Sequence, residues 1–216
     1  MPAHEDSEIA GVVLAGGRSR RMGGADKALV RFGGETLLGR AIRRATAQVG
    51  PLVISTNGDV VAFAAHGLPL LPDPIAGFAG PLAGILAGLE WTILHAPHCR
   101  WLASFAVDAP LFPDDLVKRL LTATGSGGAD ITCAASAGRR HPVFALWPLE
   151  LAAPLRRALT IDRIHKVRNW TDRYRVVEVE WPSGPPDPFH NINTPEDLKR
   201  LTRISHIESD MVIHDG

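Results

Sequence analysis

Residues 11–27 read Gly11-Val-Val-Leu-Ala-Gly-Gly-Arg-Ser-Arg-Arg-Met-Gly-Gly-Ala-Asp-Lys27, and the rest of the chain is organised around them. The stretch begins inside an apolar run, Ile9 to Leu14, which is typical of a buried strand. A glycine pair ends the run, and the loop that follows carries three arginines and a lysine. Glycines let backbone N–H groups approach phosphates, and cations neutralise phosphate charge. The pattern therefore favours a loop that binds polyphosphate.

Two familiar phosphate-binding motifs do not fit this loop. Lys27 follows Asp26 and precedes Ala28, so the P-loop spacing is missing, and the paired glycines do not form G-x-G-x-x-G. The alternative interpretation is a solvated basic loop after the first strand of an α/β protein. Four cations against the single acid Asp26, in a chain of zero formal net charge, favour phosphate binding.

Composition is that of a globular protein with one domain. The chain has 216 residues, of which 45% are apolar and 21% are charged. Lys plus Arg and Asp plus Glu both number 23, which argues against nucleic acid or an anionic membrane as the main partner. Cys99 and Cys133 lie far apart, which favours buried thiols in a reducing compartment. With no apolar leader and no apolar run long enough for a membrane span, a cytoplasmic location is expected.

Apolar strands alternate with amphipathic helices along most of the chain, which predicts a mostly parallel sheet with helices on both faces. The single domain is expected to span residues 9–203, after an N-terminal extension of residues 1–8. The segment 204–216 shows no clear periodicity and is expected to be a disordered tail. Strands are predicted at residues 9–14, 28–32, 51–56, 68–71, 101–107 and 175–181, with a small antiparallel hairpin formed by 130–135 and 142–147. Helices are predicted from Thr36, near 60–65, from Pro81, from Pro113, over 149–159 and 162–170, and from Thr194.

Polar residues follow several of these strands, and in parallel sheets the strand ends meet at one edge, where ligands bind. The loop 15–27, Ser55 to Asn57, Asp73 and Asp108 are therefore expected to converge. Asp108 either caps the turn after its strand or binds Mg²⁺, and a cationic glycine loop opposite it favours the second role. Asp73 either hydrogen-bonds a nucleoside or caps its own loop.

Two other polar residues have ordinary explanations. Asn57 precedes Gly58 and is explained best as a turn residue. His141 lies beside Arg139 and Arg140 and is interpreted as part of a surface loop at the tip of the hairpin. The chain has no nucleophile–base motif, so the polar residues suit transfer at phosphorus by positioning and charge neutralisation. Lys27 and Arg21 would hold a triphosphate, and attack at the α- or γ-phosphate stays open.

Five short motifs carry a resemblance to a known family. They are Leu14-Ala-Gly-Gly17 with Arg21-Met-Gly23 and Asp26-Lys27, then Gly80-Pro-Leu-Ala-Gly84, Val107-Asp-Ala-Pro110, His141-Pro142 and Asn191-Ile-Asn-Thr-Pro195. In this order they resemble the molybdenum cofactor guanylyltransferases of the Rossmann-like nucleotidyltransferase superfamily. The resemblance covers about residues 9 to 203, and the full set is more specific than the loop alone.

The resemblance implies a single Rossmann-like domain and a Mg²⁺-dependent reaction. GTP and the molybdopterin-bound molybdenum cofactor would give the guanine dinucleotide cofactor and pyrophosphate. The chain is expected to act as a monomer and to pass its product to molybdoenzyme apoproteins or their chaperones. The implied GTP-binding residues are Leu14, Ala15, Gly16, Gly17, Lys27, Ser55, Asp73 and Asp108. The implied catalytic residues are Lys27, Asp108 and Arg21, the metal ligand is Asp108, and Asn191 and Asn193 lie on the pterin side.

One departure from the family pattern concerns the base. The family often has Asn where this chain has Ser55, with an asparagine two residues later at Asn57. A serine hydroxyl lacks the paired donor and acceptor of an amide. A cytidylyltransferase for the same cofactor, another NTP-dependent nucleotidyltransferase, and a non-catalytic nucleotide-binding module are the alternatives.

Overall fold

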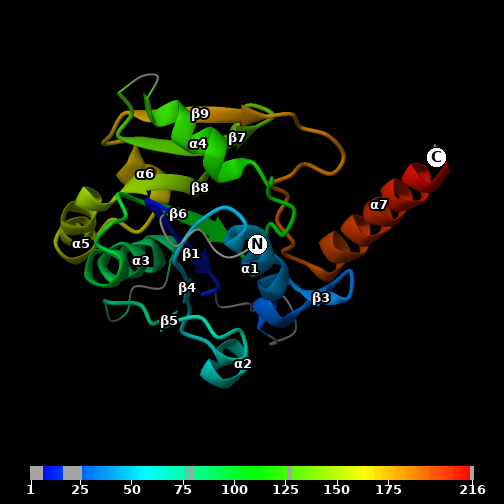
Figure 1. Cartoon of the computed structure of the whole chain (residues 1–216), viewed down its shortest axis with the longest axis horizontal. Coiled ribbons are helices and arrows are strands. Elements are labelled where there is room, and N and C mark those ends of the chain that lie inside the picture. Colours follow the sequence, from blue (N-terminus) through cyan, green and yellow to red (C-terminus); the bar gives the residue numbers. More distant parts are fainter. Residues whose placement is uncertain (1–6, 17–25, 76, 78–79, 126–127, 215–216) are drawn as a thin grey trace.

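The computed structural model describes residues 7–16, 26–75, 77, 80–125 and 128–214, with side chains up to residue 204. A seven-stranded sheet forms its centre, with helices on both faces (Figure 1). Neighbouring strands are parallel except where β8 pairs with β6 and with β7. The prediction of a mostly parallel sheet covered on both faces is confirmed. In spatial order the strands are β5 (Leu70–Leu71), β4 (Leu52–Ser55), β1 (Ile9–Leu14), β6 (Trp101–Ala106), β8 (Arg139–Pro148), β7 (Ile131–Ser136) and β9 (Val176–Trp181).

The helices divide between the two faces according to their apolar stripes. One core contains side chains of α1 (Leu37–Thr46), α2 (Val60–Ala64) and α4 (Leu116–Gly125). The opposite core contains side chains of α3 (Pro81–His95), α5 (Ala152–Thr160) and α6 (Val167–Thr171). Figure 1 shows α3 and α5 next to each other on that face. Because β1 and β6 are buried between the two cores, their sequences are apolar throughout except for Ser104 of β6.

Helix α1 begins where its sequence predicts. The Oγ1 atom of Thr36 accepts a hydrogen bond from the N–H of Gly39 at 3.0 Å, which is a side-chain N-cap. Its apolar positions Leu38 and Ala41 are fully buried against the sheet. Pro81 likewise stands at the start of α3, as predicted.

Strand β8 of the hairpin begins at Arg139, earlier than the predicted start at residue 142. Ala137 and Gly138 both have positive φ, 49° and 68°, as a two-residue primed turn requires. Arg139, Arg140 and His141 therefore belong to β8, and the interpretation of His141 as part of a surface loop is wrong. The separate two-stranded pair consists of β2 (Arg31–Phe32) and β3 (Glu35–Thr36).

Four other predicted boundaries differ from the structure. Only the end of the expected strand 28–32 is a strand, because a 3₁₀ turn, η1 (Lys27–Leu29), comes first and is capped by the carboxylate of Asp26. The expected segment 149–159 begins with a second 3₁₀ turn, η2 (Leu149–Leu151), and the helix expected over 162–170 starts at α6. Helix α7 (Pro195–His214) extends past residue 204, away from the sheet (Figure 1). The Oγ1 atom of Thr194 accepts the N–H of Asp197 at 3.1 Å, so the helix begins from a capped first turn and its hydrogen bonds continue past residue 204.

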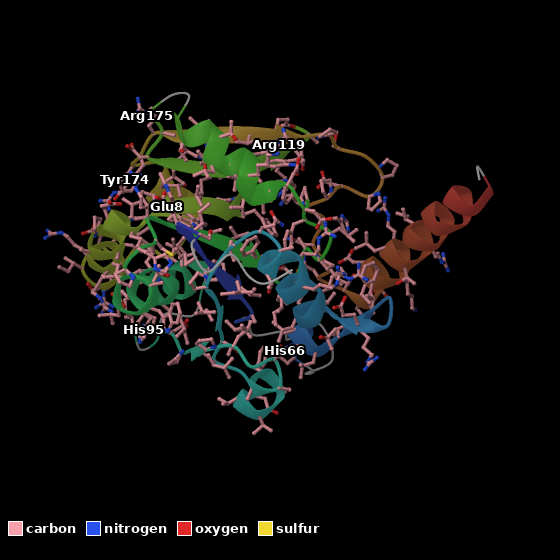
Figure 2. All side chains as sticks on the ribbon, viewed as in Figure 1. Glu8, His66, His95, Arg119, Tyr174 and Arg175 are labelled. Carbon is pink, nitrogen blue, oxygen red and sulfur yellow. The ribbon has the colours of Figure 1, made fainter. Side chains whose placement is uncertain are left out.

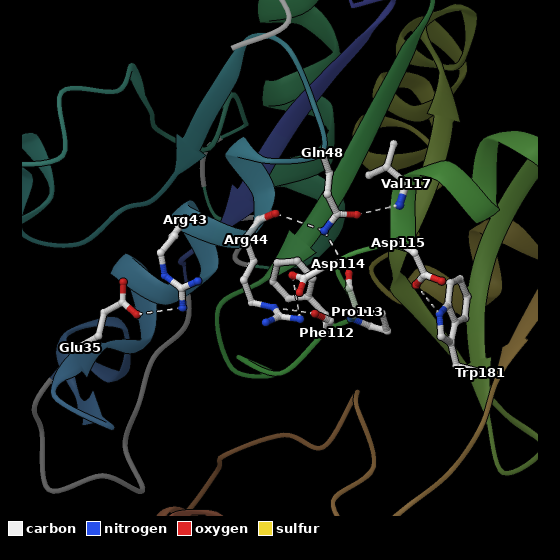
Figure 3. Close-up of polar contacts among 10 residues, drawn as sticks. All are labelled: Glu35, Arg43, Arg44, Gln48, Phe112, Pro113, Asp114, Asp115, Val117 and Trp181. Carbon is white, nitrogen blue, oxygen red and sulfur yellow. Dashed lines mark hydrogen bonds and ion pairs between the residues drawn. The ribbon is translucent and has the colours of Figure 1, made fainter. Parts of the chain in front are cut away.

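Polar contacts tie α1 to the segment that follows β6 (Figure 3). Arg44 donates from Nε to the carbonyl of Phe112 at 2.7 Å and pairs with Asp114 at 3.0 Å. Gln48 donates to the carbonyl of Pro113 and accepts from the N–H of Val117, both at 3.0 Å. Arg44 therefore anchors the chain between β6 and α4.

Helix α4 packs against β9, the edge strand of the sheet. Arg119 of α4, labelled in Figure 2, donates to the carbonyl of Glu180 at 2.7 Å. Its guanidinium carbon lies 4.2 Å from the ring centroid of Trp181, a cation–π contact. The indole N–H of Trp181 donates to Asp115 at 3.0 Å.

Both cysteines are buried free thiols, as expected. Burial raises the pKa of Cys133 to about 12, so this thiol stays protonated and unreactive at neutral pH. Across the described part of the chain, no helix combines the length and apolar character that crossing a bilayer would need.

Candidate functional site

The carboxyl ends of β1, β4 and β6 lie side by side at one edge of the sheet. Leu14 is in register with Ser55 on one side and with Ala106 on the other. The N–H of Ala15 donates to the carbonyl of Ser55 at 2.9 Å, and the N–H of Val107 donates to the carbonyl of Leu14 at 3.3 Å. The convergence predicted for these strand ends is therefore what the structure contains.

Lys27, Asp108 and Asn193 meet at this edge although they are far apart in sequence. The Nζ atom of Lys27 is 3.2 Å from Oδ2 of Asp108 and donates to Oδ1 of Asn193 at 2.8 Å. The side chain of Lys27 is 14% exposed and that of Asp108 is 30% exposed, so the pair is accessible at its rim. A lysine and a carboxylate held together at a sheet edge supply a positive charge and a hard oxygen ligand in one place.

Asp73 lies after β5 and is held by Asn57, which follows β4. The Oδ1 atom of Asn57 accepts the backbone N–H of Asp73 at 3.0 Å. Burial raises the pKa of the Asp73 carboxyl, and a hydrogen bond from the Asn57 side chain opposes this rise. Asn57 is therefore more than a turn residue, because it joins the ends of two neighbouring strands. The parallel pairing of β4 and β5 brings the two residues together, which local turn chemistry could not indicate.

Ser55 is buried at the end of β4 and faces the first turns of α3. It is 3% exposed. A Cβ atom added at Gly84 would lie 2.6 Å from Oγ of Ser55 and 2.7 Å from Cδ2 of Leu14. Only a glycine lets α3 approach these two strand ends so closely.

We therefore expect Gly84→Ala to weaken nucleotide binding. The added methyl must displace Ser55 or Leu14, and overpacking of this kind typically costs about 1–3 kcal/mol. Titration with GTP and thermal unfolding of the variant would measure the two effects. The matched control is Gly125→Ala, at a helical glycine with open space around it. Equal GTP affinity in Gly84→Ala and the wild type would contradict the assignment of Ser55 and Leu14 to the nucleotide side.

Of the remaining expected site residues, the structure describes Gly16 and Asn191 but not Gly17 and Arg21. Gly16 is exposed at the end of β1, with open space around it. Asn191 is exposed, and its neighbour Ile192 donates its N–H to the carbonyl of Asp108 at 2.7 Å. Gly17 and Arg21 lie outside the described residues.

The donor set at Asp108 can be compared with the needs of a divalent cation. Among the residues that the structure describes, no three His, Cys, Asp or Glu side chains are grouped so that they could hold a metal ion by themselves. Mg²⁺ is usually held by one or two carboxylates together with phosphate oxygens and water. The single accessible carboxylate of Asp108 fits a cation completed by a phosphate ligand, and it does not fit an all-protein site.

A second polar cluster at the same edge was not predicted. His141 places its Nε2 atom 2.7 Å from Oγ of Ser136, and that hydroxyl donates to Oδ2 of Asp187 at 2.7 Å. Burial lowers the pKa of His141, and the charge of Asp187 opposes this. The spacing of these residues carries no signal, since 51 positions separate Ser136 from Asp187. Only the motif His141-Pro142 pointed to the region.

Comparisons with known proteins agree with this geometry. Residues 11–177 match the family model of the MobA-like NTP transferase domain. A molybdenum cofactor guanylyltransferase of Rhodopseudomonas palustris (strain BisB5) is 50% identical over 205 residues, which cover 95% of this chain and 98% of that protein. Another, from Bradyrhizobium sp. (strain ORS 278), is 47% identical over 96% of this chain and 98% of its own length. The crystal structure of molybdopterin-guanine dinucleotide biosynthesis protein A from Archaeoglobus fulgidus has a TM-score of 0.70 at 25% identity, covering 91% of this chain and 98% of that one.

Proposed function

The chain belongs to the MobA-like NTP transferase family, and from this premise we propose that it transfers GMP from GTP to the terminal phosphate of the molybdopterin cofactor. An oxygen of the acceptor phosphate would attack the α-phosphorus of GTP, and the bond to the β-phosphate would break to release pyrophosphate. The observation that carries the proposal is the meeting of Lys27, Asp108 and Asn193 at the carboxyl edge of the sheet. The naming of relatives about 50% identical over almost the whole chain supports the choice of substrates.

Each residue has a role that follows from its position. Lys27 would neutralise charge on the phosphates as the pyrophosphate departs, which positioning and electrostatics can achieve without a covalent intermediate. The backbone at Leu14 and Ala15 and the side chains of Ser55 and Asp73 would hold the nucleoside. Asn193, which contacts Lys27, would lie between the triphosphate and the acceptor.

A divalent cation, for which we propose Mg²⁺, would be held by Asp108 and by phosphate oxygens of GTP. Bound there, it would neutralise phosphate charge and favour in-line displacement. In the structure Lys27 occupies one oxygen of this carboxylate, so substrate phosphates would compete with Asp108 for the lysine. Residues 17–25, including Arg21, would complete the charge around the phosphates.

The cellular compartment, the recipient of the product and the oligomeric state are also proposals. We place the reaction in the cytoplasm, because two buried free thiols suit a reducing compartment. The product would pass to molybdoenzyme apoproteins or their chaperones, and the chain would act as a monomer.

Nucleotide selectivity tests the proposal most directly. We expect calorimetry with Mg²⁺ to show GTP binding at least about tenfold tighter than CTP or ATP, the contribution of one or two hydrogen bonds to the base. Product analysis with GTP and the pterin cofactor should then yield the guanine dinucleotide and pyrophosphate. Preference for CTP would instead indicate a cytidylyltransferase, consistent with a serine at position 55. Tight binding without turnover would indicate a non-catalytic module.

A further inference from the structure

Residues 187–193, called here the crossing segment, run along the carboxyl edge of the sheet. In Figure 1 they lie on the orange stretch that leads from β9 to the start of α7. Their contacts advance strand by strand in the spatial order of the sheet, from β9 toward β1. The successive contacts are Asp187 with Ser136 at the end of β7, Phe189 with His141 in β8, Ile192 with Asp108 after β6, and Asn193 with Lys27 after β1.

A chain of hydrogen bonds holds the first part of the crossing segment. Ser136 is 1% exposed, and its hydroxyl donates to Oδ2 of Asp187 at 2.7 Å. Because a hydroxyl has one proton, the second 2.7 Å contact of Ser136 must be donated by the Nε2–H of His141. The other oxygen of Asp187 accepts the N–H of Phe189 at 2.8 Å. One buried serine thus connects the hairpin to the crossing segment.

Aromatic packing adds to this attachment. Phe189 is 2% exposed and stacks on the ring of His141, with centroids 4.7 Å apart. It also contacts Phe144 and Trp181, at centroid distances of 5.2 and 5.7 Å. His141 therefore supports the segment in two ways, through its ring face and through its Nε2–H.

The last part of the crossing segment is fixed at the site itself. Ile192 is fully buried, and its N–H donates to the carbonyl of Asp108 at 2.7 Å. The carboxylate of Asp197 accepts the N–H groups of Asn193 and Thr194, both at 2.9 Å, and these bonds lower the pKa of that carboxyl. With both ends held, the side chain of Asn193 reaches Lys27 at 2.8 Å.

We propose that Ser136, His141 and Asp187 are positioning residues that set the place of Asn191 and Asn193 on the acceptor side of the transfer site. They act through the crossing segment, and in the part of the chain that the structure describes their side-chain hydrogen bonds go to one another and to Phe189. The inference rests on the proposed function for its kinetic consequence, because the acceptor side is defined by that reaction. Its structural consequence, the fixing of Ile192 and Asn193, is independent of any substrate.

Two alanine substitutions, each with its own control variant, test the proposal. Ser136→Ala removes the hydroxyl that joins the hairpin to the crossing segment. Asp187→Ala removes the carboxylate that accepts from this hydroxyl. Because Asp187 is less buried than Ser136, the second variant should fold even if the first does not. Asp187→Asn retains an acceptor oxygen, so it should keep the acceptor kcat/KM and the slow exchange at Ile192 that Asp187→Ala loses. The matched control is Ser104→Ala, which deletes an equally buried hydroxyl that bonds Val143 and Trp147 within the sheet.

Amide hydrogen exchange and steady-state kinetics are the two readouts. In Ser136→Ala and Asp187→Ala the amide of Ile192 should exchange about tenfold faster, the effect of losing one buried hydrogen bond, whereas Ser104→Ala should leave it unchanged. The kcat/KM for the pterin acceptor should fall about tenfold while KM for GTP stays within about twofold. Equal exchange at Ile192 in Ser136→Ala and Ser104→Ala, or a parallel rise in both KM values, would overturn the proposal. Absence of guanylyl transfer by the wild-type protein would refute the proposed function instead, and the exchange experiment separates the two failures.

Discussion

Replacing Lys27 with alanine is expected to lower kcat/KM for GTP by roughly 10²- to 10³-fold, the usual cost of removing one preorganised group that stabilises developing charge. The Nζ atom lies 3.2 Å from Asp108 and 2.8 Å from Asn193, so the two assigned sides of the site meet at this charge. The variant should also bind GTP more weakly, because the triphosphate loses a cation. Initial rates and calorimetric titration measure the two effects separately.

The controls for Lys27→Ala are a charge-matched variant and a conservative one. Lys118→Ala removes an exposed lysine of α4 and should leave both quantities unchanged. Lys27→Arg retains the charge but not the compact ammonium group, and it should recover part of the GTP affinity but little of the rate. Unchanged GTP affinity in Lys27→Ala would remove this lysine from the binding site.

Replacing Asp108 with asparagine is expected to have a comparable effect on turnover, roughly 10²- to 10³-fold, because loss of a divalent-cation ligand forfeits several kcal/mol of charge stabilisation. The substitution keeps the shape of the side chain. It also keeps the backbone carbonyl that accepts the N–H of Ile192 at 2.7 Å, so folding should be little affected. The rate should be measured over a range of Mg²⁺ concentrations, with thermal unfolding alongside.

The comparison for Asp108 is Asp114→Asn, which removes the charge of an exposed carboxylate paired with Arg44. That variant should keep full activity and show at most a small loss of stability, as exposed ion pairs contribute about 0–1 kcal/mol. If Asp108→Asn also kept full turnover, the protein would be a nucleotide-binding module rather than an enzyme, or the metal ligand would lie elsewhere.

Much of the fold could be predicted because the signals are local. The apolar run 9–14 indicated a buried strand, and the apolar run 101–107 was also predicted as a strand. Both lie at the centre of the sheet. Thr36 and Pro81 marked helix starts correctly, since a side-chain cap and a proline at the first turn act within three residues of themselves. The start of β8 was placed too late because a tight turn at Ala137 and Gly138 needs a positive φ at Ala137, which is unusual for a residue with a Cβ atom.

The candidate site could be predicted in part for a related reason. Residues directly after parallel strands must lie at one edge, so the convergence of Ser55, Asp73 and Asp108 followed from topology alone. The bond from Asn57 to Asp73 and the chain from His141 through Ser136 to Asp187 did not follow. Such contacts depend on which strands are neighbours and on where a loop returns, and neither leaves a periodic trace in the sequence.

By itself the sequence therefore determined the family, the parallel α/β architecture and the edge of the sheet at which Lys27 and Asp108 meet. These depend on apolar periodicity, glycine and proline positions, and short motifs, all of which act over a few residues. Only the tertiary structure decided that Asn193 contacts Lys27 and that residues 187–193 cross the sheet edge to reach Asp108. Those contacts bridge more than 80 positions in the chain, and the packing of Phe189 against the hairpin, rather than any local preference, brings them together.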